Sequence, residues 1–258
     1  MKLLKKINRN KFLLNMRNSF GFERMPINIF DTKNNTSISD AFPWRTDSGF
    51  KTKFKFTDIL KVLFSINESI IELKFYNNNF IELKSLILKN FDISDEINIT
   101  KEFLSYEGYG IFFIFHRTKK KVNTNSIISN RCYTGFSYKN DIYSYVHGNT
   151  LVLGKNINLK ISKNKKDFVQ KTLFVNQNYF IQNDFSDSKK IELFFINPTS
   201  KKINVIINEK NNFFLLGYNS KILSFDDKKT IYKIRSNCTF LRPFVFNYKG
   251  KFFDVHHS

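Results

Sequence analysis

Apolar and polar side chains alternate along much of the chain, which is the pattern of β-strands with one face buried and one face in water. The clearest case is GFKTKFKF at 49–56, where the Phe residues fall on one face and Lys51, Lys53 and Lys55 fall on the other. We therefore predict a half-buried strand with a solvated lysine row. The row could also bind phosphates, although a solvated face is the simpler interpretation.

Other segments predict a hairpin, a central strand and one short helix. The segments 69–76 and 80–88 flank the turn NNN, and asparagine tolerates the left-handed backbone of a hairpin turn. The segment 109–117, YGIFFIFHR, is apolar at successive positions and predicts a central strand covered on both faces. Before the hairpin, Thr57 or Asp58 could cap a short helix.

The last third of the chain shows short strands with turn residues between them. Strands are predicted on both sides of the turn NPTSK in 190–210, at 212–218, at 220–225, at 230–236 and in a final hairpin at 239–255. No convincing helical crossover of more than about ten residues lies between strands, so a parallel sheet is disfavoured. The predicted fold is all-β, with one or two antiparallel β-sandwich domains that are Ig-like or jelly-roll-like.

The strand pattern divides the chain into three predicted parts. Residues 1–35 form a basic N-terminal arm, residues 36–185 a β-sandwich domain with a tyrosine-rich surface, and residues 186–258 a C-terminal sandwich or subdomain. Residues 1–15 could instead be a transit segment, or could precede a true start at Met16. Basic residues interrupt the apolar stretch that a signal peptide needs, and no segment has the ~20 apolar residues of a membrane span. The expected location is cytoplasmic.

The chain carries a formal net charge of +20. Such a charge is typical of proteins that bind nucleic acid or anionic membranes. Lysine supplies the charge more than arginine and is spread along the whole chain, whereas base readout favours arginine. Lys, Asn, Ile and Phe are frequent together and have A/T-rich codons, so a biased genome explains much of the composition. Polyanion binding therefore stays an alternative.

Sequence motifs for common enzyme chemistry are absent. The chain has no G-x-x-x-x-G-K-[ST], G-x-G-x-x-G, G-x-S-x-G or H-E-x-x-H motif, which argues against P-loop NTPases, Rossmann enzymes, α/β-hydrolases and zincins. Cys132 and Cys238 are too few and too far apart for a disulfide framework or a C-x-x-C metal site, and we expect them to be buried apolar groups. The sequence does not identify a cofactor.

The four histidines stand at the ends of predicted strands. His116, His147 and His256 could converge on a metal ion or, with Asp254, form an acid–base group. His256 and His257 are adjacent, so they point to opposite faces of a strand and only one of them could join such a cluster. The simpler interpretation has no metal, with each imidazole making a local hydrogen bond at a sheet edge.

The segment 130–149 is rich in Tyr, Asn and Ser and has no clean apolar stripe. Tyr143, Tyr145 and His147 share one face by alternation. A hairpin here would add further candidate ligand-binding residues, namely Arg131, Tyr133, Tyr138 and Asn149. Tyrosine rings can stack on a sugar while hydroxyl, amide and guanidinium groups meet its hydroxyls, and Tyr and Arg also suit a protein partner. A tyrosine-rich core is the alternative.

Trp44 and Arg45, in AFPWRTD, could likewise either contact a ligand or belong to the core. Pro43 fixes an extended backbone before them, and Arg45 could stack on or flank a ligand.

These patterns favour a non-catalytic β-sandwich protein that recognises a glycan or a protein partner through a Tyr/Arg/His surface. One alternative is a His-dependent enzyme, with or without a metal, and a second is a protein that binds nucleic acid or an anionic surface through lysine. The sequence does not identify the ligand or the oligomeric state.

Overall fold

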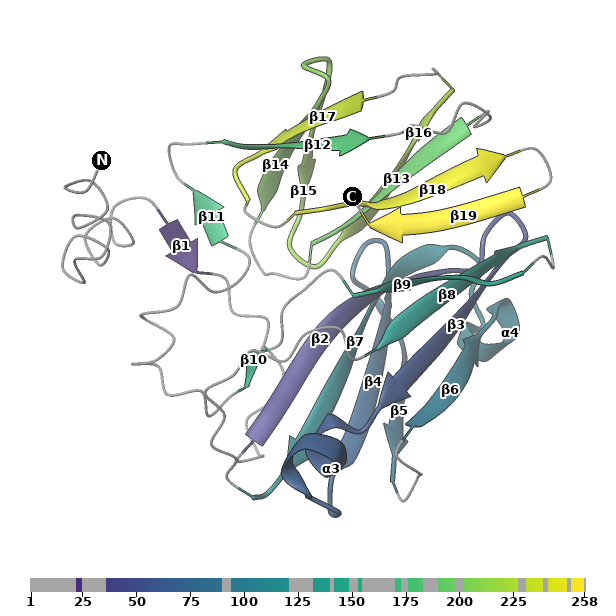
Figure 1. Cartoon of the computed structure of the whole chain (residues 1–258), viewed down its shortest axis with the longest axis vertical. Coiled ribbons are helices and arrows are strands. Elements are labelled where there is room, and N and C mark those ends of the chain that lie inside the picture. Colours follow the sequence, from purple (N-terminus) through teal and green to yellow (C-terminus); the bar gives the residue numbers. More distant parts are fainter. Residues whose placement is uncertain are drawn as a thin grey trace.

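The computed structural model shows an all-β protein, which confirms the predicted fold class (Figure 1). The strand pairings among the described residues are all antiparallel. The structure describes residues 22–24, 36–89, 94–120, 132–139, 142–148, 153–154, 170–172, 176–182, 190–197, 202–226, 231–238, 241–249 and 252–257. The predicted arm at 1–35 thus lies outside these residues, except for strand β1 (Phe22–Arg24), which pairs with β11 (Gln170–Thr172).

One sheet, called here the β2 sheet, has the strand order β10-β2-β7-β4-β5. Its strands are β10 (Leu153–Gly154), β2 (Thr36–Arg45), β7 (Tyr109–Thr118), β4 (Ile70–Asn77) and β5 (Glu82–Leu88). Strand β7 lies between β2 and β4, and its side chains from Ile111 to Phe115 are completely buried. The prediction of a doubly covered central strand and of the β4–β5 hairpin is therefore confirmed.

A second sheet, the β3 sheet, has the order β6-β3-β8-β9. Its strands are β6 (Ser94–Ile99), β3 (Phe50–Thr57), β8 (Tyr133–Tyr138) and β9 (Ser144–His147). Along β3 the even-numbered side chains are buried, whereas Lys51 and Lys55 are exposed and Lys53 is half-buried. Strong alternation therefore predicted both the strand and its outward lysine row correctly.

Two short helices accompany these sheets, α3 (Ile59–Phe64) and α4 (Lys101–Leu104). The Asp58 carboxylate accepts hydrogen bonds from the backbone N–H groups of Leu60 and Lys61 at the start of α3. Ile59 and Leu60 are buried. The predicted short helix is confirmed, with Asp58 as its cap.

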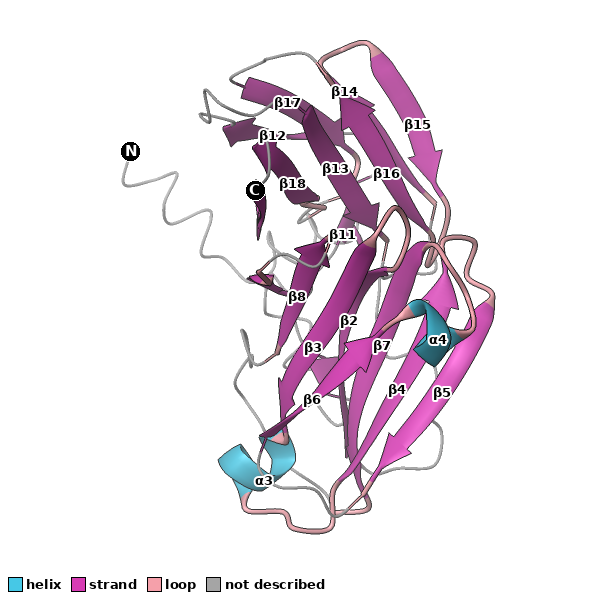
Figure 2. Ribbon diagram, turned by 90° about the vertical axis from the view of Figure 1, so that its right-hand side faces the viewer, coloured by secondary structure: helices cyan, strands magenta, loops and turns pink. Residues whose placement is uncertain are grey.

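The C-terminal part of the chain forms two four-stranded sheets. The β14 sheet contains β12 (Gln177–Gln182), β17 (Ile231–Ser236), β14 (Ile203–Ile207) and β15 (Asn211–Leu215) in that order. The β13 sheet contains β16 (Ser220–Phe225), β13 (Lys190–Ile196), β18 (Phe244–Lys249) and β19 (Phe252–His257) in that order. Figure 2 shows the strands of these two sheets above those of the β2 and β3 sheets.

The sheets share their hydrophobic cores. Alternation along β13 sends Leu193 and Phe195 into a core with the β14 sheet, and Phe194 and Ile196 into a core with the β2 and β3 sheets. A further core lies between the β2 and β3 sheets. Because the β2 and β13 sheets bury both faces, this arrangement of small sheets establishes the all-β class but does not clearly show the predicted sandwiches.

Pairing also crosses the predicted boundary at residue 185. Strand β12 falls within the predicted first domain but pairs with β17 of the C-terminal part. The strands on either side of NPTSK, β13 and β14, belong to different sheets and do not form a hairpin. Among the helices described, none is long and apolar enough to cross a membrane.

Candidate functional site

The outer face of the β3 sheet carries a patch of tyrosine and lysine, called here the Tyr–Lys face. Its members are Lys51, Lys53, Lys55, Tyr133, Tyr143 and Tyr145. Strand β8 lies between β3 and β9, and its register aligns Tyr133 with Lys55 on one side and with His147 on the other. The predicted hairpin of β8 and β9 is thus confirmed, and it brings the tyrosines beside the lysine row.

The Tyr145 ring lies against the sheet at Gly135. A Cβ added at Gly135 would come within 2.5 Å of that ring, so only glycine leaves room for it. Tyr145 remains 38% exposed and Tyr133 is 44% exposed. The backbone at Gly135 therefore supports one face of the Tyr145 ring.

A lysine ammonium lies over each of two tyrosine rings. The Lys53 Nζ is 5.1 Å from the Tyr143 ring centroid, and the Lys55 Nζ is 4.9 Å from the Tyr145 ring centroid. The two ring centroids are 6.1 Å apart. Cation–π contacts at exposed sites contribute only about 0.5–1 kcal/mol, so a stronger anionic partner can displace the ammonium groups from the rings.

The positive charge of the face is only partly compensated. Lys53 donates to Glu96 at 2.9 Å, and Lys55 lies 3.9 Å from the same carboxylate. The hydrogen bond with Glu96 raises the pKa of Lys53, and the same bond lowers the pKa of Glu96. Glu96 is the one acidic side chain that alternation places on the outer face within the described residues of these strands. Glu102 of α4 also interacts electrostatically with Lys51, so two carboxylates face the three lysines and one positive charge is left over.

The remaining residues predicted for this surface fall elsewhere. Tyr138 points inward and its ring packs on Phe50 and Tyr248. Arg131 and Asn149 lie outside the described residues.

Trp44 and Arg45 are buried and do not line a surface. Trp44 is completely buried, and its indole N–H donates to the Tyr76 carbonyl at 2.8 Å. Arg45 is 3% exposed, and its guanidinium donates to both carboxylate oxygens of Asp47. Both residues lie on β2, and at 40–45 both faces of this strand are covered, so neither parity faces water there.

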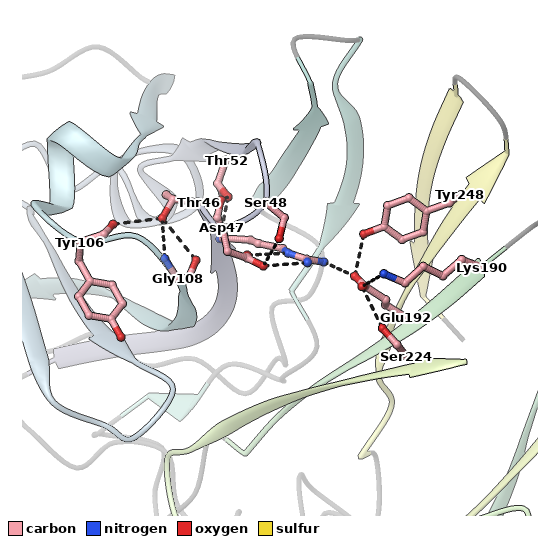
Figure 3. Close-up of polar contacts among 11 residues, drawn as sticks. Thr46, Asp47, Ser48, Thr52, Tyr106, Gly108, Lys190, Glu192, Ser224 and Tyr248 are labelled. Atoms are coloured by element: carbon pink, nitrogen blue, oxygen red, sulfur yellow. Dashed lines mark hydrogen bonds and ion pairs between the residues drawn. The ribbon is translucent and has the colours of Figure 1, made fainter. Parts of the chain in front are cut away.

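Arg45 also reaches a carboxylate of the C-terminal part, in a cluster called here the Glu192 network (Figure 3). Its Nη1 lies 2.5 Å from Glu192 Oε2, and the Tyr248 hydroxyl donates to the same oxygen at 2.7 Å. Glu192 Oε1 accepts from Ser224 and pairs with Lys190. Burial alone would raise the pKa of Glu192, but Arg45 and the other donors lower it to about 2. The network therefore joins the two parts of the chain.

Two of the histidines, His147 and His257, pair with each other, and His256 lies beside an aspartate. The His257 Nε2 contacts the His147 carbonyl oxygen at 2.6 Å, and the two imidazole centroids are 4.5 Å apart. His256 Nδ1 lies 3.8 Å from Asp254 and 3.2 Å from the Asn247 amide, so the adjacent histidines of β19 do meet different neighbours. Burial lowers the pKa of His256, and it lowers that of His257 to about 4.

The third histidine of the predicted cluster, His116, is buried within β7 between Ile38 and Ile71. Within the described part of the chain, no group of three His, Cys, Asp or Glu side chains could hold a metal ion. Cys132 and Cys238 are both buried, as expected, and burial raises the pKa of the Cys238 thiol to about 12.

The comparisons with known proteins do not identify a family. No protein-family model matches the sequence, and the search of curated proteins finds no match. A solved structure of an anti-sigma factor domain-containing protein matches with a TM-score of 0.23 and 9% identity, over 83% of this chain and 79% of that one.

Two glycoside hydrolase structures also match. A beta-glucuronidase from glycoside hydrolase family 2 gives a TM-score of 0.19 at 10% identity, over 88% of this chain and 24% of its own. A family 2 glycosyl hydrolase from Bacteroides cellulosilyticus gives a TM-score of 0.19 at 8% identity, over 91% of this chain and 29% of its own. The chain thus spans less than a third of either hydrolase, and these low scores support no statement about function.

Proposed function

We propose that the protein is a non-catalytic binding protein and that the Tyr–Lys face is its ligand site. One observation supports this most strongly. The outer face carries the exposed Tyr145 ring and the half-buried Tyr143 ring, with a lysine ammonium about 5 Å from each. Exposed rings offer a flat apolar surface, and ammonium groups offer positive charge. The ligand that fits both presents a flat ring or apolar face beside a negative charge.

The Tyr–Lys face suits the two partner classes predicted from the sequence, a glycan or a protein. Tyrosine rings can pack on a sugar ring or on a protein side chain, and the lysines add a preference for acidic forms of either. The histidine enzyme has less support, because its predicted residues are divided: His147 pairs with His257, and His256 lies beside Asp254. The two-sandwich architecture and the cytoplasmic location stay predictions of the sequence.

Binding to anionic polymers tests the proposal. We expect the protein at low salt to bind at least one of dextran sulfate, poly-L-glutamate and polyuridylate. Substitution of Lys51, Lys53 and Lys55 by Gln should weaken that binding about tenfold or more, since each lysine neutralises one anionic group. Isothermal titration calorimetry measures the affinity, and the melting temperature reports whether the variant folds.

A matched control comes from the opposite end of the molecule. The Lys202 ammonium lies 4.2 Å from the Phe214 ring beside the β14 sheet, so Lys202→Gln removes a comparable exposed lysine. This variant should bind as the natural protein does. Equal affinity of the triple variant, or no binding of any of the three polymers, would contradict the proposed function.

A further inference from the structure

The ligand class of the Tyr–Lys face follows from its spacing and charge, given the binding function proposed above. We infer that this face binds single-stranded nucleic acid without sequence preference. Proteins that bind single strands in this way combine positive charge along the backbone with aromatic rings on which bases stack. The β3 sheet holds both groups, in neighbouring rows, on one exposed face.

The spacing of the lysines suits a phosphate backbone. Alternate residues of a strand are about 6.8 Å apart, since the rise is ~3.4 Å per residue. Successive phosphates of one strand in a duplex are also ~3.4 Å apart along the axis. Phosphates of a stacked helical strand also turn about its axis, so the straight row of Lys51, Lys53 and Lys55 matches successive phosphates of an extended strand instead.

The tyrosine rings suit bases that are not stacked on one another. The Tyr143 and Tyr145 centroids are 6.1 Å apart, which is wider than the ~3.4 Å between stacked bases. Gly135 supports the Tyr145 ring from the sheet side. A duplex hides the faces of its bases, so the rings can only be used by a strand whose bases are unpaired.

Charge distinguishes a nucleic acid from the other ligand classes. A neutral glycan carries no negative charge for the three ammonium groups, and the Glu96 carboxylate that could accept from its hydroxyls already pairs with Lys53. An acidic peptide would use the lysines without needing the rings. Nucleotides present a flat ring and a phosphate in each repeat, which is the combination on this face.

The residue types also indicate that binding does not depend on base sequence. The described members of the face are lysines and tyrosines, with no arginine among them. Lysine contacts a phosphate as a point charge, and every base has a π-face that can stack on tyrosine. Neither group distinguishes one base from another.

Fluorescence anisotropy with paired probes tests this inference. The probes are an oligothymidylate of about 12 nucleotides, an abasic strand with the same phosphates, and the matching duplex. The natural protein should bind oligothymidylate at least about fivefold more tightly than the abasic strand, because stacking of a single base contributes about that much. Tyr145→Leu, which keeps an apolar group over Gly135 but leaves Tyr143 in place, should reduce this advantage and leave abasic-strand binding unchanged.

The lysines give an independent readout. Changing Lys51, Lys53 and Lys55 to Gln should weaken binding of oligothymidylate and of the abasic strand alike. It should also reduce the slope of log affinity against log salt by about 2, as single strands lose about 0.7 for each phosphate contact. Phe214→Leu, on the 58% exposed ring beside Lys202, is the control and should change nothing.

Each failure has a separate meaning. Equal affinity for oligothymidylate and the abasic strand, tighter binding of the duplex, or a Tyr145→Leu variant that binds oligothymidylate normally would overturn the nucleic-acid inference. If the lysine triple variant then still loses affinity for dextran sulfate or poly-L-glutamate, the proposed function stands with a glycan or peptide as its ligand. If it loses affinity for none of the polymers, the proposed function fails as well.

Discussion

The Tyr–Lys face and the Glu192 network use the same kinds of side chain in opposite environments. In the network, the Arg45 and Glu192 side chains are 3% and 6% exposed, whereas Lys55 and Glu96 of the β3 sheet are 51% and 44% exposed. Water and salt screen exposed ion pairs and leave buried ones strong. The ion pairs of the Glu192 network therefore stabilise the fold, whereas the charged groups of the Tyr–Lys face stay available to a ligand.

The largest expected difference in stability is between variants of the two carboxylates, Glu192 and Glu96. Glu192→Gln should lower the free energy of unfolding by about 3 kcal/mol, because it removes one of the two carboxylates that pair with the buried Arg45. Glu96→Gln should leave stability unchanged, since its pair with Lys53 is at the surface. Urea unfolding of both variants measures the difference, and equal stability would remove the distinction between the regions.

The stability that Glu192 contributes should depend on pH. The pKa of Glu192 is lowered to about 2 in the fold from an ordinary 4.5, so the unfolded chain binds the proton first. The stability that the ionised group contributes is fully present above pH 4.5 and is lost as the pH falls toward 2. The difference in unfolding free energy between the natural protein and Glu192→Gln should therefore shrink across this range. A constant difference would show that Glu192 does not titrate in this way.

The two tyrosines offer a smaller contrast. Tyr248→Phe removes a hydroxyl that donates to Glu192 at 2.7 Å and should cost about 1.5 kcal/mol of stability. Tyr145→Phe keeps the exposed ring, so both stability and ligand affinity should stay as they are. A loss of affinity in Tyr145→Phe would mean that the hydroxyl, and not the ring, binds the ligand.

Sequence patterns predicted the exposed region better than the buried network. Alternation alone placed the lysine row outward and Tyr143 and Tyr145 on one face. A strand with one face in water alternates apolar and polar residues, so the sequence indicates which positions point outward. The contact between Lys53 and Tyr143 was missed, since it depends on β8 pairing with both β3 and β9. A search for basic and aromatic positions of equal parity on neighbouring strands could have found it.

The Glu192 network could not be predicted in the same way. Arg45 and Glu192 are 147 residues apart, and no local pattern joins them. Trp44 and Arg45 were expected to flank a ligand, but β2 is covered on both faces by packing between distant sheets. The alternation of a strand indicates two faces and does not show whether a second sheet covers the polar one.

Photochemical cross-linking tests the central claim, that the outer face of the β3 sheet holds the ligand. Oligothymidylate is irradiated on the natural protein, and the cross-linked peptides are identified by mass spectrometry. The cross-links should fall on Tyr133, Tyr143 or Tyr145 and disappear in the Lys51, Lys53 and Lys55 triple variant. Cross-links confined to other parts of the chain, for example to Phe180 or Phe214 of the β14 sheet, would contradict the claim.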